Sequence, residues 1–138
     1  DIDNCNTYGE NISLKNMLNE DENGDGIDFY HSVADLKKID VCGFRDKGIS
    51  VGEKSYIQIS ESKICSNNIG VAIKDNSCFL LKEDNIFRDN VTDISIYKKK
   101  SHYGSGTLVF NKQIQNLKIL KDDLAKIVKK DINFDCFG

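Results

Sequence analysis

The sequence GISVGEKS at residues 48–55 and the sequence GVAIKDNS at residues 70–77 share one pattern, and their first glycines are 22 positions apart. In both, β-branched apolar residues alternate with small residues, and a polar stretch ending in serine follows. Weaker copies begin at Gly26, 22 positions before the first of these glycines, and at Asp93, 23 positions after the second. A repeat of this length indicates a solenoid of stacked coils.

Each copy contains three short apolar segments, which predicts three strands per coil. Ile49–Val51 is followed by Ile57–Ile59 and then by Ile64–Cys65, with polar residues between them. A period of two is that of a strand with one buried face. Ordinary parallel sheets need crossover connections of about a dozen residues, which this spacing does not leave room for. The predicted fold is all-β, a three-faced parallel coil of about 22 residues per turn that is clearest over residues 24–110.

The C-terminal part of the chain has a different pattern. Leu117–Ile119 is expected to be the third strand of the last coil. Leu120, Leu124, Ile127 and Val128 then recur at spacings of four, three and one, which is one face of a helix. We therefore expect an α-helix at about residues 120–130 that caps the solenoid and completes a single domain of residues 1–138.

Composition and charge exclude some classes of protein. The chain of 138 residues has a net charge of −3, which gives no general attraction to nucleic acid or to an anionic membrane. No apolar run approaches the roughly 20 residues of a membrane-spanning helix. The abrupt start at Asp1 indicates a processed or truncated chain.

The five cysteines show no CxxC spacing and do not predict a zinc site. We interpret Cys42, Cys65 and Cys78 as small buried hydrophobic residues. Cys5 and Cys136 lie near the two ends and are either paired with each other or free.

A calcium site is considered at Asp21, Asn23 and Asp25, which match the first half of an EF-hand loop. The second half does not match, because Ser32 stands where a bidentate glutamate is required. A solvated turn that leads into a strand explains these residues as well. We therefore expect no cofactor and no metal.

Residues 46–55 (DKGISVGEKS) and 67–77 (NNIGVAIKDNS) resemble the right-handed parallel β-helix repeat proteins of the pectate-lyase-like superfamily. The likeness is to largely uncharacterised bacterial β-helix modules, some of them attached to cell-surface or spore-coat-type proteins. It covers about residues 25–110 and implies a right-handed, single-stranded parallel β-helix and an extracellular or cell-surface location. The superfamily includes lyases, hydrolases, epimerases and non-enzymatic scaffolds, so the resemblance implies a fold rather than one activity.

Residues one repeat apart should stack at about 4.8 Å, as neighbouring strands do. On the outward face of the first strand this gives two columns of residues: Asp28, Ser50, Ala72 and Ser95, and then Tyr30, Gly52, Lys74 and Tyr97. Together they form a shallow strip of small residues with aromatic and charged margins. The strip could hold an extended sugar chain, although small outward residues also ease stacking. We predict substrate-binding roles for Asp28, Tyr30, Lys54, Lys74, Tyr97 and Tyr103.

A third column joins His31, Glu53 and Asp75, each 22 positions from the next. Neighbouring carboxylates raise one another's pKa, which favours an acid/base pair, and retaining glycosidases place two carboxyls about 5 Å apart. These three are the candidate catalytic residues, and a solvated corner of weak ion pairs is the alternative. Pectate-lyase-type chemistry would need an arginine base, but Arg45 and Arg88 belong to the opposite corner.

The segment KKKSHYGSG at residues 98–106 breaks the period where earlier coils turn a corner. A loop inserted there must project outward, and its lysines, His102 and Tyr103 could hold an acidic polysaccharide. An ordinary solvated loop is the other explanation.

The leading hypothesis for function is a non-enzymatic β-helix module, for surface structure or carbohydrate recognition, with a polysaccharide as its partner. The alternatives are a polysaccharide-active lyase or glycoside hydrolase and a self-assembling structural module. The latter would form homo-oligomers through the N-terminal end or through the outward apolar residues Leu80 and Val109. The chain could also belong to a larger parent protein.

Overall fold

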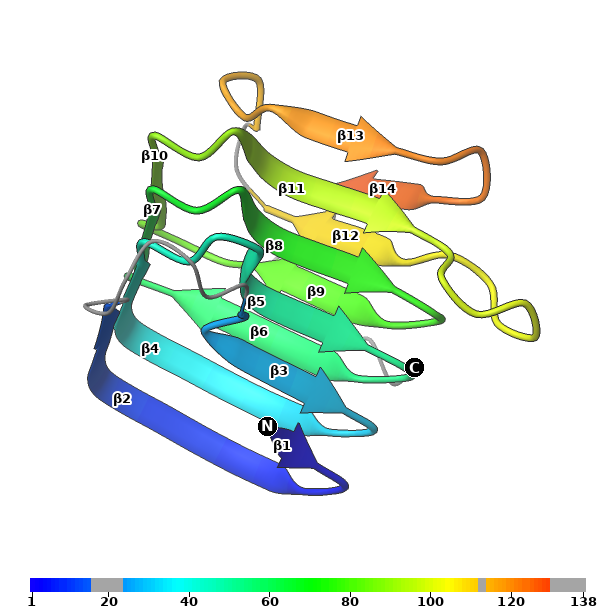
Figure 1. Ribbon diagram of the computed structural model, residues 1–138, viewed down its shortest axis with the longest axis horizontal. Coiled ribbons are helices and arrows are strands. Elements are labelled where there is room, and N and C mark those ends of the chain that lie inside the picture. The colour runs from blue at the N-terminus through cyan, green and yellow to red at the C-terminus, as the bar shows by residue number, and fades with distance from the viewer. Residues whose placement is uncertain (16–23, 112–113, 130–138) are drawn as a thin grey trace.

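The computed structural model describes residues 1–15, 24–111 and 114–129, and it is a parallel β-solenoid of about five turns (Figure 1). Successive turns are about 23 residues apart, one more than the two strongest repeats predict. The parallel, repetitive, all-β architecture is therefore confirmed.

Two parallel sheets run along the stack of coils. Sheet A takes one strand from each coil, in the order β1 (Ile2–Asp3), β3 (Ile27–Tyr30), β5 (Lys47–Gly52), β8 (Ile69–Lys74), β11 (Thr92–Tyr97) and β13 (Ile119–Lys121). Sheet B contains β2 (Asn6–Lys15), β4 (Val33–Cys42), β6 (Tyr56–Ser60), β7 (Lys63–Cys65), β9 (Cys78–Leu81), β10 (Ile86–Arg88), β12 (Thr107–Phe110) and β14 (Lys126–Lys129). The long strand β4 pairs with β6 at its start and with β7 at its end, so two predicted faces of the coil form one continuous sheet.

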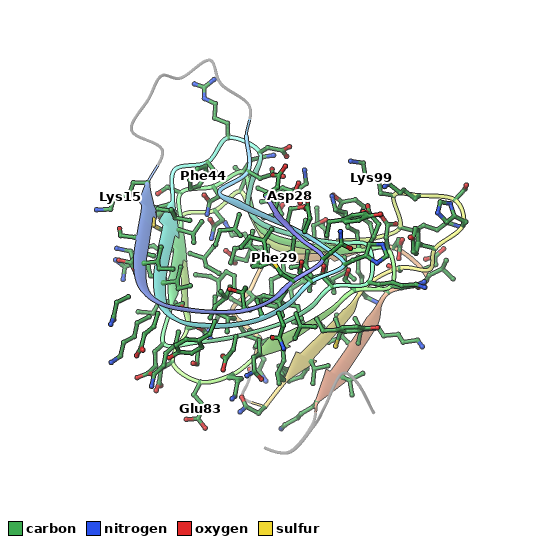
Figure 2. The ribbon with its side chains drawn as sticks, turned by 90° about the horizontal axis from the view of Figure 1, so that it is seen from below. Lys15, Asp28, Phe29, Phe44, Glu83 and Lys99 are labelled. Atoms are coloured by element: carbon green, nitrogen blue, oxygen red, sulfur yellow. A yellow bond between two sulfur atoms is a disulfide. The ribbon has the colours of Figure 1, made fainter. Side chains whose placement is uncertain are left out.

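The core follows from residues that stack one coil above another. Phe29 pairs with Val51, Val51 with Ile73, and Ile73 with Ile96, and all four side chains are fully buried. Figure 2, viewed along the stack, shows Phe29 inside the coil and its neighbour Asp28 on the outer side. The predicted alternation of inward and outward residues is present.

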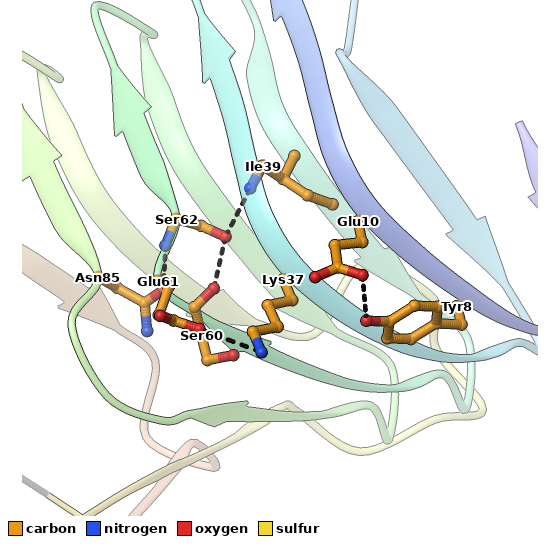
Figure 3. A network of polar contacts seen from close by, with 8 residues as sticks. All are labelled: Tyr8, Glu10, Lys37, Ile39, Ser60, Glu61, Ser62 and Asn85. Atoms are coloured by element: carbon orange, nitrogen blue, oxygen red, sulfur yellow. Dashed lines mark hydrogen bonds and ion pairs between the residues drawn. The ribbon is translucent and has the colours of Figure 1, made fainter.

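Polar side chains at the corners bond to the backbone of the adjacent coil. The amide of Ser32 donates to Ser55 Oγ at 3.1 Å, and the amide of Ser55 donates to Ser77 Oγ at 3.1 Å. At another corner Ser62 Oγ accepts from the Ile39 amide at 3.0 Å, as Figure 3 shows. These residues satisfy backbone groups that the strands leave unpaired, which is a structural role.

The predicted C-terminal α-helix is not present in the described residues. Ile119–Lys121 is the sheet A strand β13 rather than a third segment, because Ile119 pairs with Ile94. Lys126–Lys129 is strand β14, which pairs with β12. The preceding coil presents backbone N–H and C=O groups with which both segments pair as strands. These backbone hydrogen bonds stabilise the strands more than the spacing of only four apolar residues would stabilise a helix. The described residues contain no helix that is long and apolar enough to cross a membrane.

Two lysines occupy core-facing positions in the last described coil. Lys121 pairs with the core residue Ile96, and Lys129 pairs with Phe110, yet both lysines are exposed. Charged residues at inward positions of an edge strand oppose pairing with a further strand. The lysines therefore protect this edge, which is the role that we expected of the helix.

The double variant Lys121→Ile and Lys129→Phe is expected to associate more strongly than the parent chain, because it places apolar side chains at two exposed, core-facing positions of the last described coil. The measurement is the average mass by sedimentation at matched concentration. Lys126→Ile is the control, because Lys126 pairs with Thr107 on the outward face of the same strand. An equal increase in mass for both variants would contradict the edge-protecting role.

The interpretation of Cys42, Cys65 and Cys78 as small buried hydrophobic residues missed their disulfide bonds, although Cys65 and Cys78 are buried as expected. Cys42 and Cys65 form a disulfide with an S–S distance of 2.01 Å, which joins adjacent coils at the ends of β4 and β7. Cys78 is also disulfide-bonded. Cys5 is free and exposed, so it is not paired with Cys136, which lies outside the described residues.

Candidate functional site

The predicted column of His31, Glu53 and Asp75 is present only in part, although backbone hydrogen bonds join adjacent coils at this corner. The His31 amide donates to the Glu53 carbonyl at 2.9 Å, and the next coil continues with the Lys54 amide on the Asp75 carbonyl at 2.9 Å. However, the first corner is one residue shorter, because His31 directly precedes Ser32 whereas Glu53 and Lys54 both precede Ser55. His31 and Lys54 both have a left-handed backbone, with φ of 47° and 52°. The backbone conformation of His31 thus corresponds to that of Lys54 rather than Glu53.

The two carboxylates of this column contact the projecting loop. Asp75 is fully buried, and its Oδ1 accepts hydrogen bonds from the amides of Lys99 and Lys100 at 2.8 and 2.9 Å. Glu53 is 7% exposed, and its Oε1 lies 3.1 Å from Lys100 Nζ. Within the described residues no hydrogen bond or ion pair joins the side chains of His31, Glu53 and Asp75. The structure therefore ties both acids to one loop instead of forming a triad.

The loop of residues 98–106 is bound to the coil before it and to the turn after it. Asn76 Oδ1 accepts from the Gly104 amide at 2.9 Å. Asp122 accepts from the Lys98 amide at 2.8 Å and from Ser105 Oγ at 2.7 Å. Burial acts against ionisation of Asp122, but these hydrogen bonds, together with those from the amides that follow it, lower its pKa below the ordinary value. The loop projects outward as predicted (Figure 1), and its base is fixed by these contacts.

Two lysine–tyrosine pairs lie where the loop crosses the corner. Lys100 Nζ lies 5.9 Å from the centre of the Tyr30 ring, and Lys54 Nζ lies 6.0 Å from that of Tyr103. The ring of His31 packs against Tyr30 at 4.2 Å between centroids. We call Tyr30, Lys54, Lys100 and Tyr103 the loop cluster. It contains three of the predicted binding residues together with Lys100, one of the loop lysines that the sequence analysis considered for an acidic polysaccharide.

The predicted strip on the outer face of sheet A is not open. Asp28 pairs with Ser50 and Ser50 with Ala72, as expected, but Ser50 and Ala72 are fully buried. Lys74 is only 6% exposed, and its Cε lies 3.4 Å from where a Cβ on Gly52 would be. The small residues are therefore covered by longer side chains such as that of Lys74, and they do not form an open groove.

Tyr97 is half-buried at the far edge of this face. Burial raises its pKa, and the charge of Lys47 opposes that rise. Tyr30 at the other margin is 39% exposed. The strip thus separates into a covered centre and the accessible loop cluster.

Of the calcium candidates, only Asp25 lies in the described residues. It accepts a hydrogen bond from the Lys47 amide at 3.1 Å, and Lys47 Nζ lies 3.8 Å away. Asp21 and Asn23 lie outside the described residues. In the described ranges no group of three or more histidine, cysteine or acidic side chains could hold a metal ion.

A cavity of about 640 Å³ lies at the base of the loop, on the side of sheet B. Its lining includes Tyr56, Asn76, Gly104, Thr107 and Leu124. None of its lining residues belongs to the loop cluster.

The fold and these contacts define the protein as a parallel β-solenoid with one anchored, projecting loop. No protein-family model, curated protein or solved structure matches the chain. The repeat architecture is shared with the family that the sequence resembles, whereas membership of the pectate-lyase-like superfamily stays a prediction.

Proposed function

We propose that this chain is a non-catalytic β-solenoid module of an exported protein, which recognises carbohydrate through the loop cluster. The observation that carries the proposal is the anchoring of residues 98–106 by Asp75, Asn76 and Asp122. A loop fixed before binding loses little conformational entropy when a ligand is bound. The chain thus presents a rigid recognition element on a rigid scaffold.

The chemistry of the loop cluster suits a saccharide. Tyrosine offers a flat apolar ring and a polar hydroxyl, which match the apolar face and the hydroxyl edge of a sugar. Lys54 and Lys100 add hydrogen-bond donors beside the two rings. A long saccharide could contact Tyr30 and Tyr103 together.

The disulfides support export. Disulfides persist in oxidising compartments and are rare in the cytosol. Cys42 and Cys65 are bonded to each other and Cys78 is bonded as well. We therefore propose an extracellular or cell-surface location, consistent with the resemblance to surface-attached β-helix modules.

The enzymatic alternative has less support from the geometry. Both oxygens of the Asp75 carboxylate are shielded from solvent, and one already accepts two backbone hydrogen bonds. Glu53 is paired with Lys100, which would have to move before the carboxylate could act on a substrate. A general acid or base needs a proton-transfer partner within reach.

Tyr30→Ala and Tyr103→Ala are each expected to weaken binding of a saccharide about tenfold, because each removes one ring that contacts the ligand. A glycan array would identify the saccharide, and titration calorimetry would measure the change in affinity. Tyr8→Ala is the matched control, since Tyr8 is 58% exposed and outside the loop cluster.

Three results would contradict this proposal. The first is equal binding by all three tyrosine variants and the parent chain. The second is turnover of the bound glycan that Glu53→Gln abolishes, which would establish the enzymatic alternative. The third is an absence of glycan binding together with a stable oligomer, which would favour the self-assembling module.

A further inference from the structure

Cys78 forms a disulfide on the outer face of sheet B. It is the first residue of β9, and its side chain points outward, because the next residue, Phe79, belongs to the core. Of the other four cysteines, two form the bond between β4 and β7, and Cys5 is free. The remaining cysteine of the chain is Cys136, which lies outside the described residues. Within one chain, Cys136 is therefore the partner left for Cys78.

Apolar residues on the same outer face are covered. Val109 of β12 follows the core residue Leu108 and so points outward, yet it is fully buried. Its outward neighbours in the sheet, Leu80 of β9 and Val128 of β14, are half-buried. Strands β9 and β14 lie on either side of β12 (Figure 1), and β8 contacts it across the core. A segment other than these strands therefore covers Val109.

The cavity of about 640 Å³ lies beside the bonded cysteine. Cys78 lines it together with Tyr56 and Thr107, which are its partners on the two adjacent strands. Leu124 and Val128 add apolar surface, and Leu124 is 59% exposed. A chain segment that reaches Cys78 thus meets an apolar recess.

The sequence before Cys136 suits this surface. In the C-terminal segment, residues 130–138, the apolar residues Ile132, Phe134 and Cys136 alternate with polar residues. A period of two places all three on one side of an extended chain. The segment therefore has one apolar side, which includes the cysteine.

The segment is also long enough to reach Cys78. Cys136 is seven positions after Lys129, the last residue of β14, and seven extended residues span about 23 Å. Cys78 is in register with Thr107, which is in register with Lys126. The path from Lys129 to Cys78 is thus about 10 Å across two strand spacings and about 10 Å back along the strands.

We propose that the C-terminal segment docks on the outer face of sheet B, with Cys136 bonded to Cys78 and its apolar side over Val109 and the cavity. Formation of the bond removes two protons and two electrons from the two thiols, and a disulfide oxidant of an exporting compartment accepts them. The docked segment shields apolar surface from other chains. It also supports the projecting loop, because Gly104 at the base of the loop lines the same cavity. The proposal is independent of any carbohydrate ligand.

Peptide mapping of the intact, unreduced chain tests the bond. Free thiols are blocked before digestion, and mass spectrometry then identifies the linked peptides. We expect one linked peptide that contains Cys78 and Cys136, and a blocked thiol at Cys5. A link between Cys78 and any other cysteine overturns the proposal, and so does a link between two chains that doubles the unreduced mass.

The rate at which dithiothreitol reduces the bond at Cys78 tests the docking. Phe134→Ser is expected to raise this rate about tenfold or more, because burial of a phenylalanine is worth at least that factor and exchange depends on access to the sulfur atoms. Phe137→Ser is the matched control, since Phe137 falls on the other side of the alternation and should leave the rate unchanged. Thermal melting establishes that both variants are folded. Equal rates for Phe134→Ser, Phe137→Ser and the parent chain would show a segment that is tethered but not docked, and would overturn the docking.

Discussion

Replacing both Cys42 and Cys65 by alanine is expected to lower the free energy of unfolding by about 3 kcal/mol. The disulfide links residues 23 positions apart, which is one whole turn of the solenoid. Closing a loop of this size restricts the unfolded chain, an effect worth about 3 kcal/mol in the chain-entropy model. Denaturant unfolding of the double variant measures it. Replacing both residues avoids a free thiol, and it leaves the disulfide at Cys78 in place.

Cys5→Ala is the matched control, because Cys5 is free and exposed. It should change the free energy of unfolding by less than about 0.5 kcal/mol, as exposed substitutions usually do. Unchanged stability in the double variant would mean that the bond contributes nothing in the folded chain. The support that this disulfide gives to export would then be lost.

The disulfide was accessible to sequence reasoning. Cys42 and Cys65 are equivalent positions of adjacent coils, so their backbones must lie about one strand spacing apart. Their Cα atoms are 4.6 Å apart, which is within the range of disulfide geometry. The sequence analysis looked for cysteines that are close in sequence and found none. In a solenoid, however, the cysteines that can bond are those one full turn apart.

The repeat predicted the coils well because stacking is in register over residues 27–97. The insertion at residues 98–106 then shifts the phase, so the last coil has no clear counterpart in the sequence. Because residues after the insertion could not be aligned with the earlier coils, the spacing of Leu120, Leu124 and Ile127 was interpreted as that of a helix. Their exposure of 62%, 59% and 37% shows that no helical face is buried there.

The candidate site was predicted in part. The period alone predicts a column of His31, Glu53 and Asp75, but the shorter first corner gives His31 the backbone conformation of Lys54. The engagement of both acids by the loop does not follow, because an insertion has no equivalent in other coils. The position of the insertion in the sequence did, however, indicate that the loop would contact Asp75. Asp75 turns the same corner one coil earlier, so an inserted loop must start beside it.

Gly70→Ala is expected to lower the free energy of unfolding by about 3 kcal/mol. A Cβ on Gly70 would lie 2.5 Å from the carbonyl oxygen of Asp93 and 3.2 Å from Ile64 Cγ2. The carbonyl belongs to the adjacent coil, so relief requires the two coils to separate at this point. Overpacking a buried position typically costs 1–3 kcal/mol, and a backbone obstacle places this change at the upper end. Denaturant unfolding with far-UV circular dichroism measures the loss.

The same geometry explains the glycine that opens each repeat. A Cβ on Gly26 would lie 2.7 Å from the Gly48 carbonyl oxygen, and one on Gly48 would lie 2.8 Å from that of Gly70. The glycine is therefore required by the close stacking of coils, and it does not by itself indicate a binding surface. Gly24→Ala is the control, since no atom lies within 4 Å of a Cβ there. If Gly70→Ala and Gly24→Ala unfold at the same denaturant concentration, the coils do not stack this closely along the glycine column. The positions of Ser50 and Lys74, which depend on the same register, would then have to be revised.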